Sequence, residues 1–242
     1  MSEAAISLKD VKIRYRMMNK VSFFRALVSR STYSKTKYFE AVKGVSFEIP
    51  KGQILGIVGK NGSGKSTLLR AIAGIFSPDE GTIDLHGNTI SLLSIGVGFQ
   101  NALSGRENIY LSGMLLGFSR EFIDEKLEEI IEFSELGDFI DRPVKSYSSG
   151  MYSKLAFSIT AILETDIMLI DEVLSVGDAK FRKKSEKKIM DMFERGVTVI
   201  FVSHSLEQVQ RLCDKAIILQ NGTLLASGDI GEVTEIYKTM IN

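Results

Sequence analysis

The chain of 242 residues lacks the features of a secreted or membrane-spanning protein. Its only cysteine, Cys213, excludes an internal disulfide, a thiolate zinc cluster and a CxxC redox pair. No run of about eighteen apolar residues occurs, because Glu164 and Asp166 interrupt the most apolar region, so we expect no self-sufficient membrane span. The N-terminus has no basic stretch leading into an apolar one, as a secretory signal would. A reduced, cytosolic compartment is the simplest expectation.

The chain also lacks a charge excess, because lysine and arginine total 30, as do aspartate and glutamate. The balance gives no reason to expect nucleic acid or an anionic surface as a partner. Internal repeats, low-complexity tracts and long linkers are missing from the sequence as well. The hydrophobic content of 44% is enough for the core of one large α/β domain or two modest ones.

The most informative motif is a complete G-x-x-x-x-G-K-[ST] phosphate-binding loop at residues 59–66. An apolar strand is predicted before it at 54–58 and a helix after it at 67–73. Backbone N–H groups of such a loop surround an anion, and the helix points its positive end at the same place. A glycine-rich turn with an accidental lysine is the alternative. We predict that the loop binds a nucleoside triphosphate through Gly59, Asn61, Gly62, Ser63, Gly64, Lys65, Ser66 and Thr67.

Two further apolar strands end in polar side chains. Residues 167–172 end in Asp171 and Glu172, and residues 197–202 are followed by His204. Apolar strands separated by helices favour a parallel sheet buried on both faces, with ligands beyond the carboxyl ends of its strands. We therefore expect these side chains to meet the phosphate loop, although a pair of surface acids and a structural histidine are the alternatives.

The chemistry expected at this edge is hydrolysis of a triphosphate. Lys65 would reach the β- and γ-phosphates, and Ser66 and Asp171 would bind or orient Mg²⁺. Glu172 would activate or position the water that attacks the γ-phosphate. His204 would contact the γ-phosphate or polarise the same water.

The remaining elements are predicted from periodicity. Alternating residues indicate antiparallel strands at 6–15 and 45–49, and two strands joined by a tight turn at 82–85 and 89–95. Other predicted elements are a loop at 96–105, helices over 107–116, 121–133, 150–163, 179–195 and 230–240, and a hairpin of 216–219 and 223–226.

Residues 17–37 form a basic insertion between two predicted strands. Its apolar residues Val21, Phe23, Phe24, Leu27 and Val28 have helical spacing. The pattern leaves two interpretations open: an amphipathic helix at a membrane surface or against a partner, or a surface helix that covers the small sheet.

The motifs together resemble the nucleotide-binding subunit of an ATP-binding cassette (ABC) transporter over nearly the whole chain. They are the phosphate loop, a glutamine loop at Gln100, a signature segment at 147–151, the acidic strand end at 167–172, and residues 174–178 and 202–204. The resemblance implies an α/β fold: a P-loop ATPase core with a mainly parallel sheet, an antiparallel β subdomain and an inserted α-helical subdomain. In one domain of 1–242, the core would take 1–95 and 165–242, the inserted amphipathic helix 17–37, and the helical subdomain 100–164.

The same resemblance implies a head-to-tail dimer of two copies, with two ATP molecules sandwiched between the phosphate loop of one and the signature segment of the other. Ser148, Ser149 and Gly150 would face the partner's γ-phosphate from a helix N-terminus. The usual signature is LSGGQ, and this chain departs from it at Tyr147, Ser149 and Met151. Ser148 and Gly150, the pair most suited to phosphate contact, are kept.

Further roles follow from the resemblance alone. Gln100 would sense Mg²⁺ and the permease, and Asp178 would signal across the dimer. Tyr15 would stack on adenine, with Tyr38 and Phe39 as competitors. The implied Mg²⁺ ligands are Ser66, Gln100 and Asp171.

A narrower resemblance, carried by residues 103–108, 131–137, 145–151 and 171–178, is to the subfamily that energises export of cell-surface polysaccharides. Teichoic acid exporters are the nearest, beside capsule and O-antigen exporters. It implies translocation of a lipid-linked polysaccharide by a separate permease, expected in two copies, with this chain peripheral on the cytoplasmic face of the cell membrane. Similar members carry an amphipathic helix beside the membrane, which favours that interpretation of 17–37. Some O-antigen relatives add a C-terminal carbohydrate-binding domain, for which a chain ending at Asn242 has no room.

Two functions compete with transport. A non-transport ABC ATPase of DNA maintenance or cofactor assembly would act without a permease, but the neutral charge and the missing heptad run between phosphate loop and signature disfavour a chromosome-type protein. A catalytically idle regulatory subunit is disfavoured by the presence of Glu172 and His204.

Overall fold

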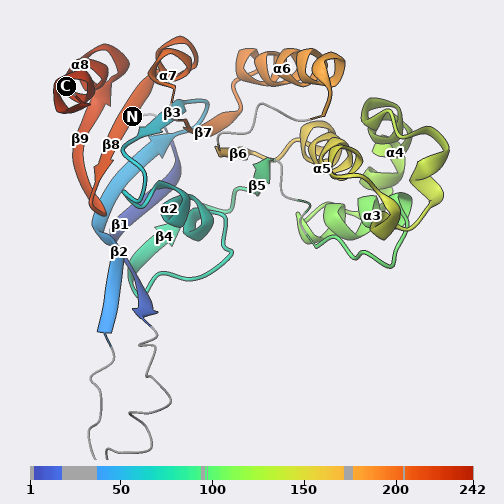
Figure 1. Cartoon of the computed structure of the whole chain (residues 1–242), viewed down its shortest axis with the longest axis horizontal. Coiled ribbons are helices and arrows are strands. Elements are labelled where there is room, and N and C mark those ends of the chain that lie inside the picture. The colour runs from blue at the N-terminus through green and yellow to red at the C-terminus, as the bar shows by residue number, and fades with distance from the viewer. Residues whose placement is uncertain are drawn as a thin grey trace, which may run out of the picture.

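The computed structural model describes residues 3–17, 37–93, 96, 98–171, 177–203 and 205–241. The predicted Glu172 and His204, and residues 18–36 of the basic insertion, lie outside these residues. Figure 1 shows a large sheet at the centre, a smaller sheet below it and a lobe of helices to one side.

A six-stranded sheet forms the centre, in the order β5-β6-β7-β3-β8-β9. All neighbours are parallel except the β8–β9 hairpin. The parallel core was predicted from apolar strands without alternation, and both faces are indeed buried. The strands are β3 (Ile54–Val58), β5 (Ile90–Leu93), β6 (Ile167–Asp171), β7 (Thr198–Val202), β8 (Lys215–Gln220) and β9 (Thr223–Asp229).

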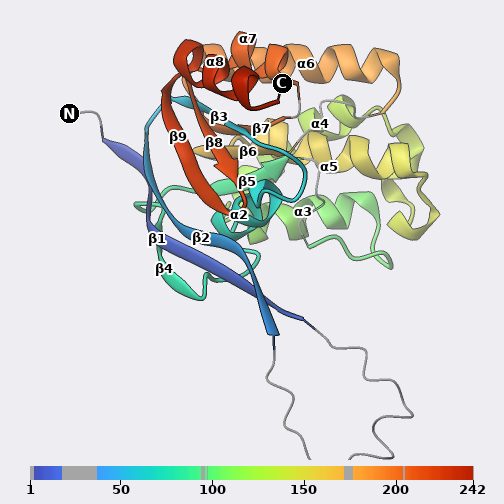
Figure 2. The same cartoon turned by 60° about the vertical axis from the view of Figure 1, so that its left-hand side comes forward.

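An antiparallel sheet of order β2-β1-β4 packs against one side of the core. Its strands are β1 (Ala4–Met17), β2 (Lys37–Pro50) and β4 (Glu80–Asp84). β2 begins earlier than the predicted 45–49, because its first residues pair with the end of β1, with Tyr15 opposite Phe39. The ends of β1 and β2 project beyond the rest of the described chain (Figure 2).

Residues 82–85 and 89–95 were predicted as two strands joined by a tight turn, and the structure has both strands, as β4 and β5. The two strands follow one another through a turn, but β4 pairs with β1 and β5 pairs with β6. His86 and Gly87 have positive φ in that turn, and the Asn88 amide donates to the Ala5 carbonyl at 3.1 Å. The turn therefore carries the chain from one sheet to the other, and the apolar residues of β5 are buried in the parallel core.

Helices cover the two faces of the central sheet differently. Helix α2 (Lys65–Ile72) packs with Leu68, Leu69 and Ile72 into the core shared by both sheets. The opposite face is covered by α6 (Ala179–Glu194), α7 (Leu206–Leu212) and α8 (Ile230–Ile241), as Figures 1 and 2 show. Helix α7, which begins after the N-cap Ser205, was not predicted from the sequence.

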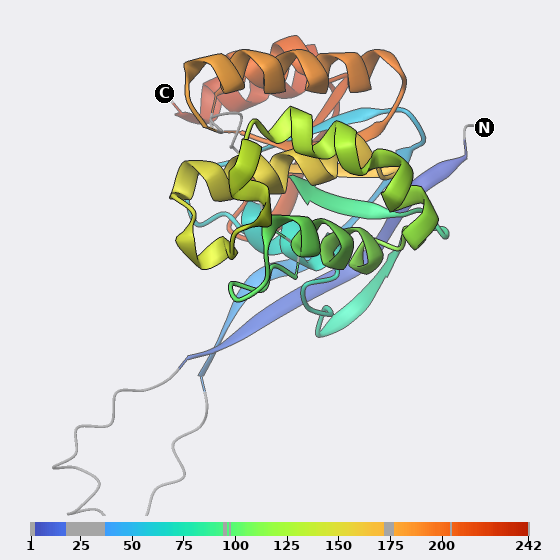
Figure 3. The same cartoon turned by 90° about the vertical axis from the view of Figure 1, so that its right-hand side faces the viewer.

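A lobe of helices with its own core stands beside the sheets (Figure 3). It comprises α3 (Gly105–Leu115), α4 (Arg120–Ser134), α5 (Ser149–Leu163) and two short 3₁₀ turns, Gly137–Asp141 and Val144–Ser146. Helix α5 is buried on every side from Leu155 onward, because Ile159 faces the lobe core and Phe157 faces the core beneath α6. It leads directly into β6. Within the described ranges, no helix has both the length and the apolar character to cross a bilayer.

Candidate nucleotide site

The phosphate loop lies at the carboxyl edge of the central sheet, as predicted. The parallel register places Ile57 beside Val202, and Val202 beside Asp171, so β3, β7 and β6 end at one level. The chain leaving β3 consequently meets the end of β6. Gly64 has a φ of 104°, and a Cβ on it would lie 2.5 Å from the Ala41 carbonyl oxygen, so only glycine fits this close approach.

Lys65 is the first residue of α2 and one of the few buried cations of the described chain. Its Nζ donates to the carbonyl oxygens of Gly59 at 2.7 Å and Lys60 at 3.2 Å. Burial lowers the pKa of Lys65 below its ordinary value, and the nearby Asp171 carboxylate opposes this shift. The loop thus folds around the ammonium group and holds it inside the site.

A pocket of about 300 Å³ opens over this loop. It joins residues from both sheets and α2, and brings the predicted Tyr15 and Asp171 together with the phosphate loop. The lining residues are Tyr15, Phe39, Ala41, Asn61, Gly62, Ser63, Gly64, Lys65, Ser66, Thr67, Asp171 and Val202.

The residues present fit a triphosphate with a divalent cation. The Ser63 hydroxyl is buried and has no hydrogen-bond partner in the described part of the chain, so a polar group is available to a ligand. The first turn of α2 contains no acidic residue that would repel an anion. Ser66 and Asp171 supply the oxygen atoms that Mg²⁺ prefers, and both line the pocket.

The structure separates the three aromatic residues considered for adenine. Tyr15 and Phe39 are opposite one another on β1 and β2 and both line the pocket, whereas Tyr38 pairs with Arg16 and does not. The Tyr15 hydroxyl donates to Thr67 Oγ1 at 3.5 Å, which holds the ring beside the loop. Adenine stacking by Tyr15 stays a prediction, with Phe39 as the neighbouring surface.

Replacing Tyr15 by alanine should raise the KM for ATP about fivefold, which corresponds to ~1 kcal/mol of lost stacking. Steady-state ATP hydrolysis by the purified chain measures this. Tyr38→Ala is the matched control and should stay within about twofold, because the ring is exposed outside the pocket. Equal effects of the two substitutions would contradict the assignment.

Gln100 does not line the pocket, so the structure does not bring this predicted Mg²⁺ ligand to Asp171 and Ser66. Its loop is held instead by Asn108, which is fully buried in α3. The Asn108 Oδ1 accepts from the Gln100 backbone N–H at 2.7 Å, and its Nδ2 donates to the Gln100 carbonyl at 3.1 Å. Asn108 was not predicted as part of the site, although an amide side chain beside a loop is typical of such an anchor.

The predicted signature residues lie at the start of α5. Ser148 is its N-cap, and its Oγ accepts from the Met151 N–H at 3.2 Å. Ser148 and Ser149 are exposed, and Gly150 is half-buried. None of the three lines the pocket of their own chain. The amide groups in the first turn of a helix have no partner within that helix, so this end presents donors to an external anion.

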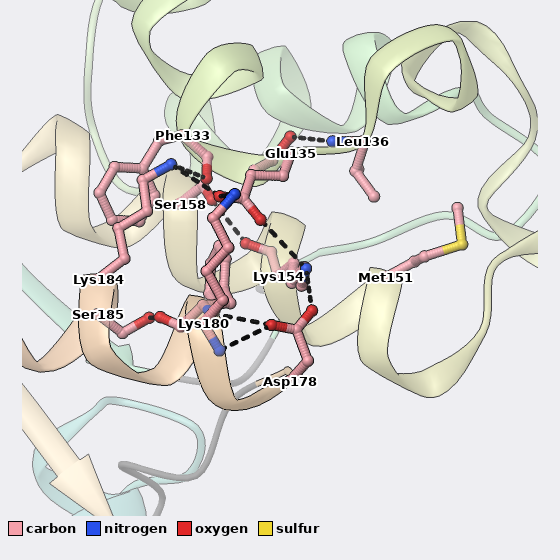
Figure 4. Close-up of polar contacts among 12 residues, drawn as sticks. Phe133, Glu135, Leu136, Met151, Lys154, Ser158, Asp178, Lys180, Lys184 and Ser185 are labelled. Atoms are coloured by element: carbon pink, nitrogen blue, oxygen red, sulfur yellow. Dashed lines mark hydrogen bonds and ion pairs between the residues drawn. The ribbon is translucent and has the colours of Figure 1, made fainter.

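Asp178 is the N-cap of α6 and likewise lies outside the pocket. Its Oδ1 accepts from the N–H groups of Lys180 and Phe181, both at 3.0 Å, and its Oδ2 accepts from Lys154 Nζ at 2.7 Å (Figure 4). The hydrogen bond from Lys154, followed by the one from Phe181, lowers the pKa of Asp178 to about 2. Lys154 was not predicted as a functional residue, because a single lysine near the start of an apolar helix is usually solvated.

A model of the ABC transporter family matches residues 42–175, which span the phosphate loop, the signature segment and the acidic end of β6. The chain belongs to this family, and its relatives place it with the polysaccharide exporters. It is 45% identical to the O-antigen export ATP-binding protein RfbB of Klebsiella pneumoniae over 84% of this chain and 83% of that protein.

The chain is also similar to proteins of teichoic acid export. It is 42% identical to the teichoic acids export ATP-binding protein TagH of Bacillus cereus over 98% of this chain, but it spans only 43% of that relative. Among solved structures, the post-hydrolysis dimer of the ATP-binding cassette MJ0796 bound to ADP and Pi aligns with a TM-score of 0.70. At 21% identity over 93% of this chain and 98% of that one, this likeness confirms the fold.

Proposed function

We propose that the chain is the ATP-hydrolysing subunit of an exporter for a lipid-linked cell-surface polysaccharide. The observation that carries the proposal is the pocket that joins the phosphate loop, Tyr15 and Asp171, in a chain whose family relatives are polysaccharide export proteins. A wall teichoic acid is the polymer that we propose in particular. Capsule or O-antigen polysaccharide is the alternative, since the sequence identity to an O-antigen export protein is 45% and that to a teichoic acids export protein is 42%.

The phosphate loop and α2 bind the triphosphate, and Lys65 exchanges its loop carbonyls for phosphate oxygens. Mg²⁺, held by Ser66 and Asp171, would neutralise phosphate charge when bound. Glu172, which directly follows Asp171, accepts the proton of the attacking water or positions that water. His204 follows β7 and supports the same water or the γ-phosphate. Both residues lie outside the described ranges, and their roles rest on their positions after β6 and β7.

Two copies form the working unit. The signature residues Ser148, Ser149 and Gly150 are absent from the pocket of their own chain but present an exposed helix N-terminus. A second copy, turned head to tail, would place this end over the triphosphate, where amide donors stabilise an anion. Closure would require ATP, and hydrolysis would reopen the pair.

The permease would dock where apolar side chains are exposed between the core and the helical lobe. Ile75, Met114 and Leu115 are each more than half exposed there, and Ile75 and Leu115 line one pocket together with Gly98, next to Gln100. Exposed apolar surface beside a functional loop is typical of a protein interface. The basic residues 17–37 would lie beside the membrane, and the chain would then act peripherally on its cytoplasmic face.

Leu115→Glu tests this function in cells that depend on the chain for surface polysaccharide. It should reduce copurification of the membrane permease and polysaccharide at the cell surface at least about tenfold, because a buried carboxylate at an apolar interface costs several kcal/mol. Basal ATP hydrolysis of the purified chain should stay within about twofold. Leu225→Glu, at an exposed position on β9, is the matched control. Normal surface polysaccharide with Leu115→Glu would contradict the docking surface, and normal polysaccharide after deletion of the chain would contradict the function.

A further inference from the structure

Lys154 of helix α5, which begins at the signature segment, bridges two carboxylates from different parts of the chain. Lys154 Nζ lies 2.7 Å from Asp178 Oδ2 at the start of α6 and 3.4 Å from Glu135 Oε2 at the end of α4. Glu135 Oε1 also forms ion pairs with Lys180 Nζ at 3.6 Å and with Lys184 Nζ at 3.5 Å. Figure 4 shows Lys154 between the two acids, with Lys180 and Lys184 reaching Glu135 from α6.

The position of Lys154 is set by packing as well as by charge. Its side chain is only 14% exposed, against 85% for Lys180. A Cβ on Gly177, where φ is +71°, would lie 2.9 Å from Lys154 Cε, so the glycine leaves the space that the lysine stem fills. The Nζ also lies 5.0 Å from the centroid of the Phe181 ring. Exposed ion pairs contribute little, but a partly buried bridge that loses one partner leaves an uncompensated charge.

The bridge connects the two segments proposed to face the second copy. Ser148 caps the helix that carries Lys154, and Asp178 follows the stretch after Glu172. We propose that Lys154 is a positioning residue, which holds the start of α5 and Asp178 in one fixed arrangement so that both reach the other copy together. The inference rests on the proposed head-to-tail dimer and adds a residue to it.

Apolar contacts also join the three helices that the bridge connects. Beneath it, the rings of Phe133, Phe157 and Phe181 pack at centroid distances of 5.8 to 6.0 Å and join α4, α5 and α6 through apolar contacts. A methionine in place of Lys154 keeps the length of the stem over Gly177. The substitution therefore removes the charge that orients Asp178 and leaves the packing between the helices.

The test measures dimer formation in the Glu172→Gln background, where ATP should be bound without turnover. Adding Lys154→Met should raise the protein concentration for half-dimerisation with Mg·ATP about tenfold, measured by light scattering after gel filtration. Affinity of the monomer for a fluorescent ATP analogue should stay within about twofold, because Lys154 does not line the pocket. Lys154→Arg should restore dimerisation, and Lys180→Met, which removes a cation from Glu135 alone, should leave it unchanged.

Asp178→Asn provides a second variant that keeps an N-cap for α6. It should weaken dimerisation to a similar degree, and Lys154→Met combined with it should add less than about twofold, since both remove one interaction. Undiminished dimerisation of the Lys154→Met variant, or fully additive effects, would overturn the inference while leaving the proposed function intact. If the Glu172→Gln chain alone does not dimerise with ATP, the proposed dimer fails and the inference fails with it.

Discussion

Replacing Lys65 by methionine should lower ATP hydrolysis at least about 100-fold, the cost of removing a charged group that acts on developing phosphate charge. The ammonium is bound by the Gly59 and Lys60 carbonyls inside the loop, and its pKa is lowered by burial. Methionine keeps the length of the lysine stem up to Cε but loses both the loop contacts and the charge. Steady-state hydrolysis and binding of a fluorescent ATP analogue measure the effect.

Arginine should not rescue this variant, because its planar, forked head group differs from a compact ammonium in a loop that closes on it. Lys60→Met is the matched control: Lys60 is exposed and only its backbone carbonyl contacts Lys65, so activity should stay within about twofold. A Lys65→Met chain that still hydrolyses ATP at the normal rate would show that the phosphate loop is not the nucleotide site.

Glu172→Gln should lower ATP hydrolysis about 100-fold or more while ATP binding persists. An amide cannot accept the proton of the attacking water, whereas the charge of Asp171 and the phosphate loop are untouched. With Mg·ATP, the variant should accumulate as a dimer that the active chain forms only transiently. Hydrolysis assays measure the loss of turnover, and gel filtration with light scattering measures the dimer.

The control for this variant is Glu207→Gln, which removes an exposed carboxylate from the first turn of α7 and should leave the turnover rate within about twofold. Full activity of the Glu172→Gln chain would show that another residue is the general base. Loss of ATP binding by that chain would instead indicate that Glu172 holds the end of β6 in place.

The central fold could be predicted because its strands are short, apolar and followed by polar residues. The run 167–170 and the run 198–202 each bury both faces, which is what a parallel sheet requires. The meeting of Asp171 with the phosphate loop followed from the rule that such strands end at a common edge. The sheets that β4 and β5 join could not be predicted by the same reasoning. A turn such as that at His86 and Gly87 fits both a hairpin and a change of sheet.

Side-chain contacts between distant segments were less accessible to sequence reasoning. Tyr15, Tyr38 and Phe39 are equivalent in the sequence, and only the register of β1 with β2 separates them. Lys154 is one of many lysines, and its burial depends on Gly177 and on the end of α4. These relations arise when three elements pack together, so no local pattern encodes them.

The continuous burial of α5 from Leu155 onward affects how the two ATP sites of the proposed dimer depend on each other. Helix α5 begins after its N-cap Ser148, which would touch the nucleotide of the other copy. It passes through a short turn into β6, whose last residue, Asp171, lines the pocket of its own chain. Because close packing leaves this segment little room to bend, a shift at one end displaces the other. Release of phosphate from one site would therefore shift residues at the other site as well. The two hydrolysis events would not be independent.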